Sequence, residues 1–291
     1  TITIERGSGL NTIAARLEEI GAVSNRYLFI GGVRVMGAQG DLKAGEYALP
    51  AGITAKAIAE KLRDHDIIGR FVTVREGLTS FEVARLLNGF EGLSGEIAAT
   101  PPEGSLLPET YDYQLNEARS KIIIRMSQAM EEAIAELWPQ RAENLPFDTI
   151  EEAITLASII EKETAKADER RTVAGVFINR LRKGMPLQTD PTVIYAITKG
   201  QHKNDGKGPL GRRLLRKDLA YDSPYNTYKY SGLPPGPIAN PGKASIAAAL
   251  NPAAHDYIYF VADGTGGHAF AKTLKEHNAN AAKWRKIRSQ R

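Results

Sequence analysis

Two carboxylates stand in an otherwise apolar helical run, and of all the residues in this chain they are best suited to chemistry. The run reads Leu156-Ala-Ser-Ile-Ile-Glu-Lys-Glu-Thr164, so Glu161 and Glu163 lie near its end. A carboxylate among apolar residues is costly unless it is paired or functional. Partial burial disfavours the charged form, which keeps a proton available near neutral pH. The run therefore predicts a general acid.

The helical spacing assigns different roles to the two acids. On a regular helix their side chains point to nearly opposite sides. Glu161 shares its face with Ala157 and Ser158, whose small side chains would leave room for a ligand. Glu163 lies beside large isoleucines that would fill a core. We therefore expect Glu161 to be the acid, with Ser158 in support, and Glu163 to be a buried partner that orients the helix end.

A purely structural role is the alternative for both acids. Lys162, Arg170 and Arg171 are close enough in sequence to form a salt bridge with either one. Structural ion-pair networks also hold buried carboxylates, so spacing alone does not decide between the two interpretations.

Three polar, aromatic and proline-rich loops are predicted to surround the acid. They read Leu187-Gln-Thr-Asp-Pro191, Ser223-Pro-Tyr-Asn-Thr-Tyr228 and Gly232-Leu-Pro-Pro-Gly-Pro-Ile238. Tyr195, Tyr225 and Tyr228 are candidates for stacking on sugar rings, although isolated aromatic residues are more often simply packed. Such loops suit a cleft that holds a polar polymer.

Composition limits the other possibilities. The chain has 291 residues, of which 42% are hydrophobic and 25% charged, as in an ordinary soluble globular protein. Its net charge of +4 fits an anionic partner such as a cell-wall polymer, a membrane surface or nucleic acid, without choosing among them. The absence of cysteine excludes disulfides, thiol nucleophiles and cysteine-based zinc sites. No His-Glu-x-x-His, phosphate-loop or Gly-x-Ser-x-Gly motif occurs.

One segment concentrates positive charge. Residues 199–217 carry Lys203, Lys207, Arg212, Arg213 and Arg216 among glycines. This segment could contact an anionic polymer, but the composition is more typical of a basic surface loop.

The chain is predicted to be α+β and to have two parts. Residues 2–17 and 72–87 each read as a short strand, a glycine turn and a helix, and a Gly- and Pro-rich stretch follows at 88–102. We expect an α+β region over 1–100 and a mixed, helix-rich α+β domain over 101–291. The first region resembles a LysM-like glycan-binding module. The alternative is two ordinary α+β units without a ligand.

A series of motifs in order extends this interpretation. They are Leu156–Thr164, Val176–Leu181, Leu187–Pro191, Tyr225–Tyr228, Gly232–Ile238, Tyr259–Val261 and Gly266–Phe270. Together they resemble the endolytic murein transglycosylase family over roughly residues 103–280. Members of this family have an N-terminal membrane anchor, a LysM-like region and a catalytic domain that cuts peptidoglycan strands internally.

The resemblance implies a function, a site and partners. Glu161 would be the catalytic acid, supported by Glu163 and Ser158, and the substrate-binding residues would be Gln188, Thr189, Asp190, Tyr195, Tyr225, Asn226, Thr227 and Tyr228. The enzyme would cleave MurNAc–GlcNAc bonds in nascent strands, leave 1,6-anhydro-MurNAc ends and so terminate elongation. It would need no cofactor or metal and would bind peptidoglycan strands and possible peptidoglycan synthases, but no nucleic acid. We expect a single-pass anchor in the bacterial inner membrane, with this region facing the periplasm or cell exterior.

Two other functions stay open at this point. A hydrolytic muramidase would need a second carboxylate within reach of the sugar, for which Asp190 is the evident candidate. A non-catalytic wall-binding scaffold would bind glycan strands without cutting them.

Overall fold

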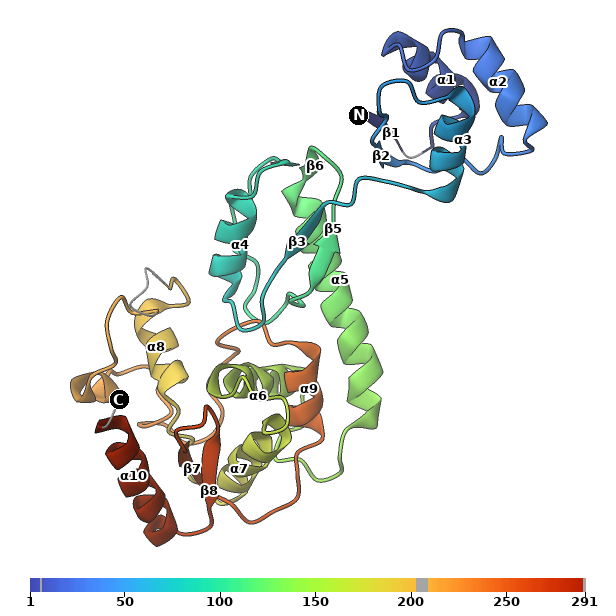
Figure 1. The fold of residues 1–291 in the computed structure, drawn as a ribbon. Coiled ribbons are helices and arrows are strands. Elements are labelled where there is room, and N and C mark those ends of the chain that lie inside the picture. Colours follow the sequence, from blue (N-terminus) through green and yellow to red (C-terminus); the bar gives the residue numbers. More distant parts are fainter. Residues whose placement is uncertain (6, 203–208, 290–291) are drawn as a thin grey trace. The chain divides into compact units, whose positions relative to one another are not determined.

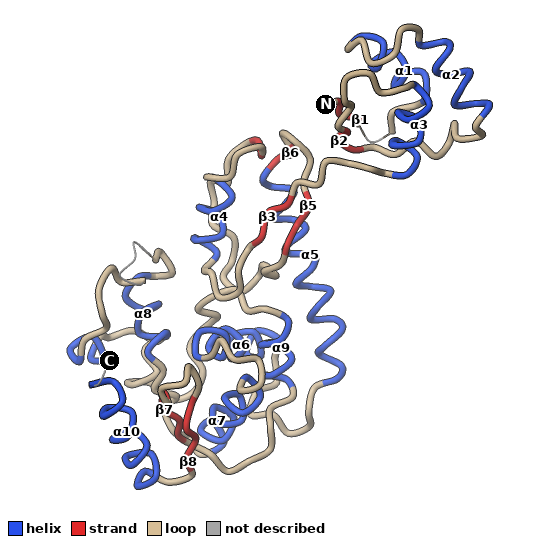
Figure 2. The backbone as a smooth tube through the Cα atoms, viewed as in Figure 1, coloured by secondary structure: helices blue, strands red, loops and turns tan. Residues whose placement is uncertain are grey.

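The computed structural model describes residues 1–5, 7–202 and 209–289. Helices predominate in them and the strands are short (Figure 2), which confirms the predicted α+β class. The chain forms two compact units: one comprises Thr1–Val72, Glu91–Ser94 and Tyr111–Glu117, and the other comprises Thr73–Phe90, Gly95–Thr110 and Ala118–Arg291. The units interleave along the chain, whereas the sequence predicts a single boundary near residue 100.

The first unit is built around a two-stranded antiparallel sheet. β1 (Ile2–Ile4) pairs with β2 (Gly45–Tyr47), so that Ile2 lies opposite Tyr47. Helices α1 (Leu10–Glu19), α2 (Arg26–Val35) and α3 (Ala55–Asp64) complete the unit (Figure 1). Its core contains fully buried side chains from both strands and from α1 and α3. The elements run in the order β1, α1, α2, β2 and α3, and the likeness to a LysM module stays a prediction.

Local signals in this unit act as the sequence predicts. The Thr54 hydroxyl accepts a hydrogen bond from the Ala57 N–H and caps α3. Ile58 and Leu62 lie on the inner face of α3 and are fully buried. Short local contacts of this kind can be predicted without knowledge of the tertiary fold.

Two further pairs of short strands follow in the chain. β3 (Phe71–Thr73) pairs with β5 (Thr110–Asp112), and β4 (Leu93–Ser94) pairs with β6 (Glu117–Ala118). The second strand-glycine-helix segment of the sequence is therefore β3 followed by α4 (Ser80–Asn88).

The second unit is mainly helical and has α6 (Ile150–Glu163) at its centre. α6 packs against α7 (Arg170–Arg182), α8 (Asp190–Thr198) and α9 (Lys243–Leu250). The hairpin of β7 (Tyr259–Ala262) and β8 (His268–Ala271) lies beside α7 (Figure 1). α5 (Arg119–Leu137) and α10 (Leu274–Ser289) are the longest helices of the unit.

No helix within the described residues combines the length and apolar character needed to cross a membrane. Of the predicted basic segment, Lys203 and Lys207 lie outside the described residues. Arg212 forms a two-pronged ion pair with Asp218, with N–O distances of 2.6 and 3.0 Å.

Candidate active site

The local sequence determines where α6 begins and why it is buried. Thr149 and Glu152 form a reciprocal capping box at its start. Every residue from 153 to 160 is buried, because neighbouring helices enclose α6 on several sides. This confirms that the apolar run is a central helix. The two acids lie in its last turn, where the helix leaves the core.

Glu161 forms an ion pair in the structure. Its Oε1 lies 3.5 Å from an Arg170 Nη2, and its Oε2 accepts a hydrogen bond of 3.0 Å from the Gly242 N–H. The side chain is only 5% exposed. Arg170 is one of the partners that the structural interpretation names. Both carboxylate oxygens of Glu161 are thus engaged by the protein.

Ser158 supports the fold around this helix rather than a ligand. Its hydroxyl donates to the Thr155 carbonyl at 2.7 Å and accepts from the Ile238 N–H at 3.0 Å. The side chain is fully buried. The small residue therefore makes room for the proline-rich loop that ends at Ile238, and this loop is the one predicted as a cleft wall.

Glu163 lies among different residues from those around Glu161. Burial raises the pKa of the Glu163 carboxyl, and the charge of Asp190 raises it further. Interactions with Thr189, His268 and Arg180 lower the same pKa and so oppose the shift. As a whole residue Glu163 is half-buried, as Glu161 is. A carboxyl whose pKa is raised by burial keeps its proton to higher pH than usual, which suits general acid catalysis.

The predicted substrate-binding loop therefore lies beside Glu163. The faces of a regular helix predict that Glu163 lies in a core and that Glu161 faces the loops. The loop that follows α7 instead reaches the carboxyl of Glu163 through Thr189 and Asp190. Helix periodicity gives the separation of the two acids but not which side the loops cover.

Gln188 adopts a backbone conformation that few side chains favour. Its φ is +53°, in the left-handed region, and its side chain is exposed. The strained conformation is held by a hydrogen bond of 3.1 Å from its N–H to the Thr227 carbonyl. Strain of this kind concentrates at functional sites, where the surroundings enforce it.

Arg180 holds the same loop from the inside. Its guanidinium donates to the carbonyls of Pro186, Leu187 and Ile258 at 3.1, 2.8 and 2.7 Å. Burial lowers its pKa, and the charge of Glu163 acts against that shift. Arg180 is not among the site residues predicted from the sequence. Its place inside the Val176–Leu181 motif was the available signal.

Asn226 and Thr227 fasten two loops together, and both are buried. The Asn226 amide donates to the carbonyls of Leu219 and Tyr221. The Thr227 hydroxyl accepts from the Thr189 N–H at 3.1 Å. Their described contacts therefore connect them to protein rather than leave them open to a ligand.

The three tyrosines predicted to bind sugar rings lie at two different positions. Tyr228 donates its hydroxyl proton to Asp190 and thus belongs to the surroundings of Glu163. The rings of Tyr195 and Tyr225 pack on each other with centroids 4.9 Å apart. Tyr195 also neighbours the carboxyl of Glu103, whose pKa burial raises to about 7.

His268 is a neighbour of Glu163 and is not among the site residues predicted from the sequence. It begins β8, and its Nδ1 lies 2.8 Å from Oε2 of Glu169, just before α7. Its backbone N–H donates to the other oxygen of Glu169 at 3.1 Å. The Gly266–Phe270 motif contained the residue, but only the hairpin brings it to the end of α6.

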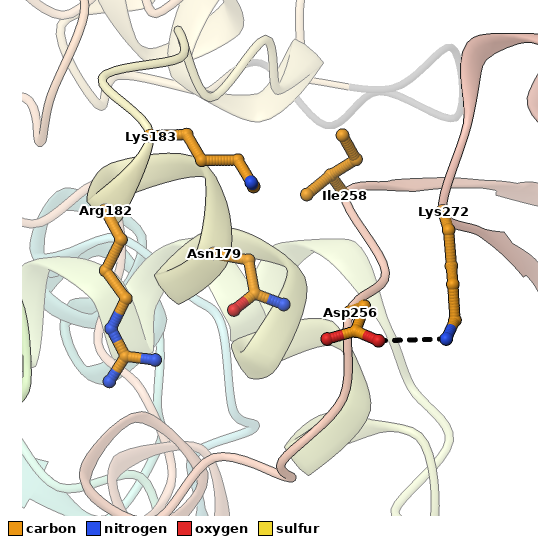
Figure 3. Close-up of a pocket in the computed structure, with 6 residues that line it drawn as sticks. All are labelled: Asn179, Arg182, Lys183, Asp256, Ile258 and Lys272. Carbon is orange, nitrogen blue, oxygen red and sulfur yellow. Dashed lines mark hydrogen bonds and ion pairs between the residues drawn. The ribbon is translucent and has the colours of Figure 1, made fainter.

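A separate pocket lies near the opposite end of α7 from Arg170 (Figure 3). It has a volume of about 610 Å³ and is lined by Asn179, Arg182, Lys183, Asp256, Ile258 and Lys272. Lys272 pairs with Asp256 at 2.9 Å. None of the predicted site residues lines it. Among the described residues, no group of acidic or histidine side chains is arranged to hold a metal ion.

Comparison with known proteins gives consistent matches over nearly the whole chain. A model of the YceG-like family matches residues 2–283. An endolytic murein transglycosylase of Bacillus subtilis (strain 168) is 35% identical over 97% of this chain and 84% of its own length. One of Streptococcus pneumoniae serotype 2 is 29% identical over 97% of this chain and 58% of its own length.

A solved structure also matches. The 2.6 Å crystal structure of a yceG-like protein from Listeria monocytogenes has a TM-score of 0.58 and 32% sequence identity to this chain. The match covers 96% of this chain and 97% of the other.

Proposed function

Because the chain belongs to the YceG-like family, we propose that it is an endolytic lytic transglycosylase that cuts the glycan strands of peptidoglycan. The name of the Bacillus subtilis relative, an endolytic murein transglycosylase, supports this activity. The bond cleaved is that between N-acetylmuramic acid and N-acetylglucosamine, and cutting nascent strands terminates their elongation.

The surroundings of Glu163 are the observation that carries the proposal. Burial raises the pKa of its carboxyl, which lies beside Thr189 and Asp190. Glu161 is 5% exposed, and both of its oxygens are occupied by Arg170 and Gly242. We therefore assign the acid to Glu163, and assign to Glu161 the structural ion pair that was its alternative.

One carboxyl suffices for the reaction. Glu163 protonates the glycosidic oxygen, and the bond to C1 of the muramic acid breaks toward an oxocarbenium-like state. The carboxylate then takes the proton of the muramic C6 hydroxyl, whose oxygen bonds to C1 and closes a 1,6-anhydro ring. The nucleophile belongs to the substrate, so the second carboxylate of most glycosidases is not required.

Asp190 keeps hydrolysis as a second candidate. Its charge raises the pKa of Glu163, so the two carboxyls are neighbours. Asp190 is also exposed, so it could activate a water molecule for attack on the sugar. Hydrolysis adds one water to the new end, whereas the transglycosylase reaction adds none. The masses of the two products therefore differ by one water.

The decisive experiment digests purified glycan strands with the wild-type chain, Glu163→Gln and Glu161→Gln, and weighs the products. We expect anhydro ends from the wild type and none from Glu163→Gln. A Glu163→Gln variant that cuts at the wild-type rate would return the acid to Glu161. Hydrolysed ends would favour the muramidase, and uncut strands from the wild type would favour a scaffold.

The location and partners of the enzyme follow from its substrate. Peptidoglycan is built outside the cytoplasmic membrane, so we propose an extracytoplasmic site of action. A membrane anchor and an association with peptidoglycan synthases belong to the same proposal, because nascent strands are made at the membrane. Association with a synthase can be tested by crosslinking the full protein in cells.

A further inference from the structure

The position of Glu163 depends on the last turn of a helix. α6 ends at Glu163, and the next residue, Thr164, is already extended, with φ −138° and ψ 131°. Helix ends fray unless other groups hold them. A reactive side chain at such an end needs a rigid support to keep its geometry within a fraction of an ångström.

Glu161 ties this last turn to two other helices. Its Oε2 accepts from the N–H of Gly242, the residue that precedes α9. Its Oε1 lies 3.5 Å from Nη2 of Arg170, the first residue of α7. The Glu161 and Arg170 side chains are 5% and 12% exposed, so solvent screens the pair weakly.

Glu76 completes the arrangement from the turn before α4. Its Oε2 lies 3.1 Å from the same Arg170 Nη2 that faces Glu161. Burial raises the pKa of Glu76, the charge of Glu161 raises it further and Arg170 opposes the shift. The Glu76 side chain is 42% exposed, so it lies at the outer edge. We call Glu76, Arg170 and Glu161 the brace.

A second contact fastens the same turn to α6. The Lys162 Nζ donates to the carbonyl of Gly77 at 3.0 Å. The N–H of Gly77 in turn donates to the Asn240 carbonyl at 3.0 Å. The two residues that precede Glu163 in the chain, Glu161 and Lys162, are therefore both held by contacts outside α6.

We propose that the brace is a positioning device for Glu163, an inference that rests on the proposed function. Glu161 and Arg170 hold the end of α6 against α7 and α9, and Glu76 fixes the guanidinium from outside. None of the three touches the substrate. A misplacement of about 1 Å can cost on the order of 100-fold in rate, so loss of the brace should slow the reaction without abolishing it.

The test measures kcat and KM for strand cleavage with the full chain carrying Glu161→Gln, Arg170→Met or Glu76→Gln. We expect kcat to fall about 10- to 100-fold for the first two, the range of a small misplacement. Glu76→Gln should lose less, because its side chain is exposed. KM should change less than threefold, and the pH–rate profile should keep the alkaline limb that Glu163 sets.

A double variant tests whether the three residues act together. If Glu161 and Arg170 work through one ion pair, Glu161→Gln with Arg170→Met should be no slower than the slower single variant. Glu136→Gln is the matched control, because it removes the carboxylate of the 2.6 Å pair with Lys243 and leaves the end of α6 untouched. That control should keep the wild-type rate.

The outcomes separate this inference from the proposed function. A Glu161→Gln rate within twofold of wild type, with Glu163→Gln inactive, overturns the brace and leaves the acid in place. Complete loss in Glu161→Gln with activity in Glu163→Gln overturns both. If Glu161→Gln does not fold, the test of the brace is Glu76→Gln, whose substitution lies at the exposed edge. An unchanged kcat in Glu76→Gln then counts against the brace.

Discussion

The Tyr228 hydroxyl donates a hydrogen bond of 2.6 Å to Oδ1 of Asp190. Burial raises the pKa of Tyr228, and the bond to Asp190 raises it further, so the phenol remains a donor at neutral pH. Asp190 is the first residue of α8, and its negative charge raises the pKa of Glu163. The bond thus fixes one exposed carboxylate beside the candidate acid.

Removing that bond should slow catalysis moderately. We expect Tyr228→Phe to lower kcat by about tenfold, because a hydrogen bond to a charged group contributes about 1.5–3 kcal/mol and water can replace part of it. Tyr230→Phe is a matched control, since Tyr230 donates to Asp222 at 2.8 Å on the exposed surface. Equal losses in both variants would show that the Asp190 contact has no special role.

The charge of Asp190 should set the pH range of the enzyme. Its anion raises the pKa of Glu163, so Asp190→Asn should lower that pKa. The acid must be protonated to act, and the alkaline limb of the kcat/KM profile should therefore move to lower pH. His268 and Arg180 also face Glu163 and remain in the variant. A limb that stays in place or moves upward would contradict the assignment of Glu163.

Asp190→Asn also tests the second candidate function. In a transglycosylase the variant should still release anhydro ends, since the nucleophile belongs to the substrate. In a muramidase it should lose the water-activating base and with it most of its activity. Mass analysis of the products separates the two results.

Glu103 should make stability depend on pH. Burial raises its pKa from 4.5 to about 7, so the folded chain holds this proton more tightly than the unfolded chain. Its contribution to stability is complete below about pH 4.5 and is lost as the pH rises through about 7. Glu103→Gln should therefore gain on the order of 3 kcal/mol over wild type between pH 4.5 and 8.

Denaturant unfolding of both chains at the two pH values measures this gain. The Ser80 N–H donates to Glu103 at 2.8 Å, and a glutamine oxygen can accept the same bond. Glu131→Gln on the exposed face of α5 is the control and should differ from wild type equally at both values. If the difference in unfolding free energy between Glu103→Gln and wild type does not grow with pH, burial does not raise the pKa of Glu103.

The sequence predicts the elements of this protein better than the assembly of its site. Caps at Thr54 and Thr149 and the apolar run of α6 depend on neighbours in the chain, so they can be read directly. The family motifs also indicated the loop at 187–191. These signals suffice for the α+β class and for the helix that carries the acids.

The choice between the acids needed the tertiary structure. Helix geometry separates Glu161 from Glu163 but cannot show which side faces Thr189 and which faces Arg170. Arg170 and Glu76 are far apart in the sequence, and their 3.1 Å pair arises only when the turn before α4 reaches α7. His268 reaches the site through the β7–β8 hairpin in the same way. Long-range contacts of this kind leave no periodic signal.

Gly242 offers the sharpest test of how closely the brace is packed. Its φ is −75°, which any residue can adopt, and its N–H would still reach Glu161 in an alanine variant. A Cβ at this position, however, would overlap the carboxylate of Glu76. Gly242→Ala should therefore fold, push Glu76 away from Arg170 and lower kcat to the level of Glu76→Ala.

The double variant that carries both Gly242→Ala and Glu76→Ala should be no slower than Glu76→Ala alone, because alanine at position 76 has no carboxylate for the new Cβ to overlap. Gly31→Ala, where a Cβ meets nothing within 4 Å, should keep the wild-type rate. If Gly242→Ala lowers kcat further in a chain that already carries Glu76→Ala, by the factor it costs alone, the glycine acts through some contact other than the brace.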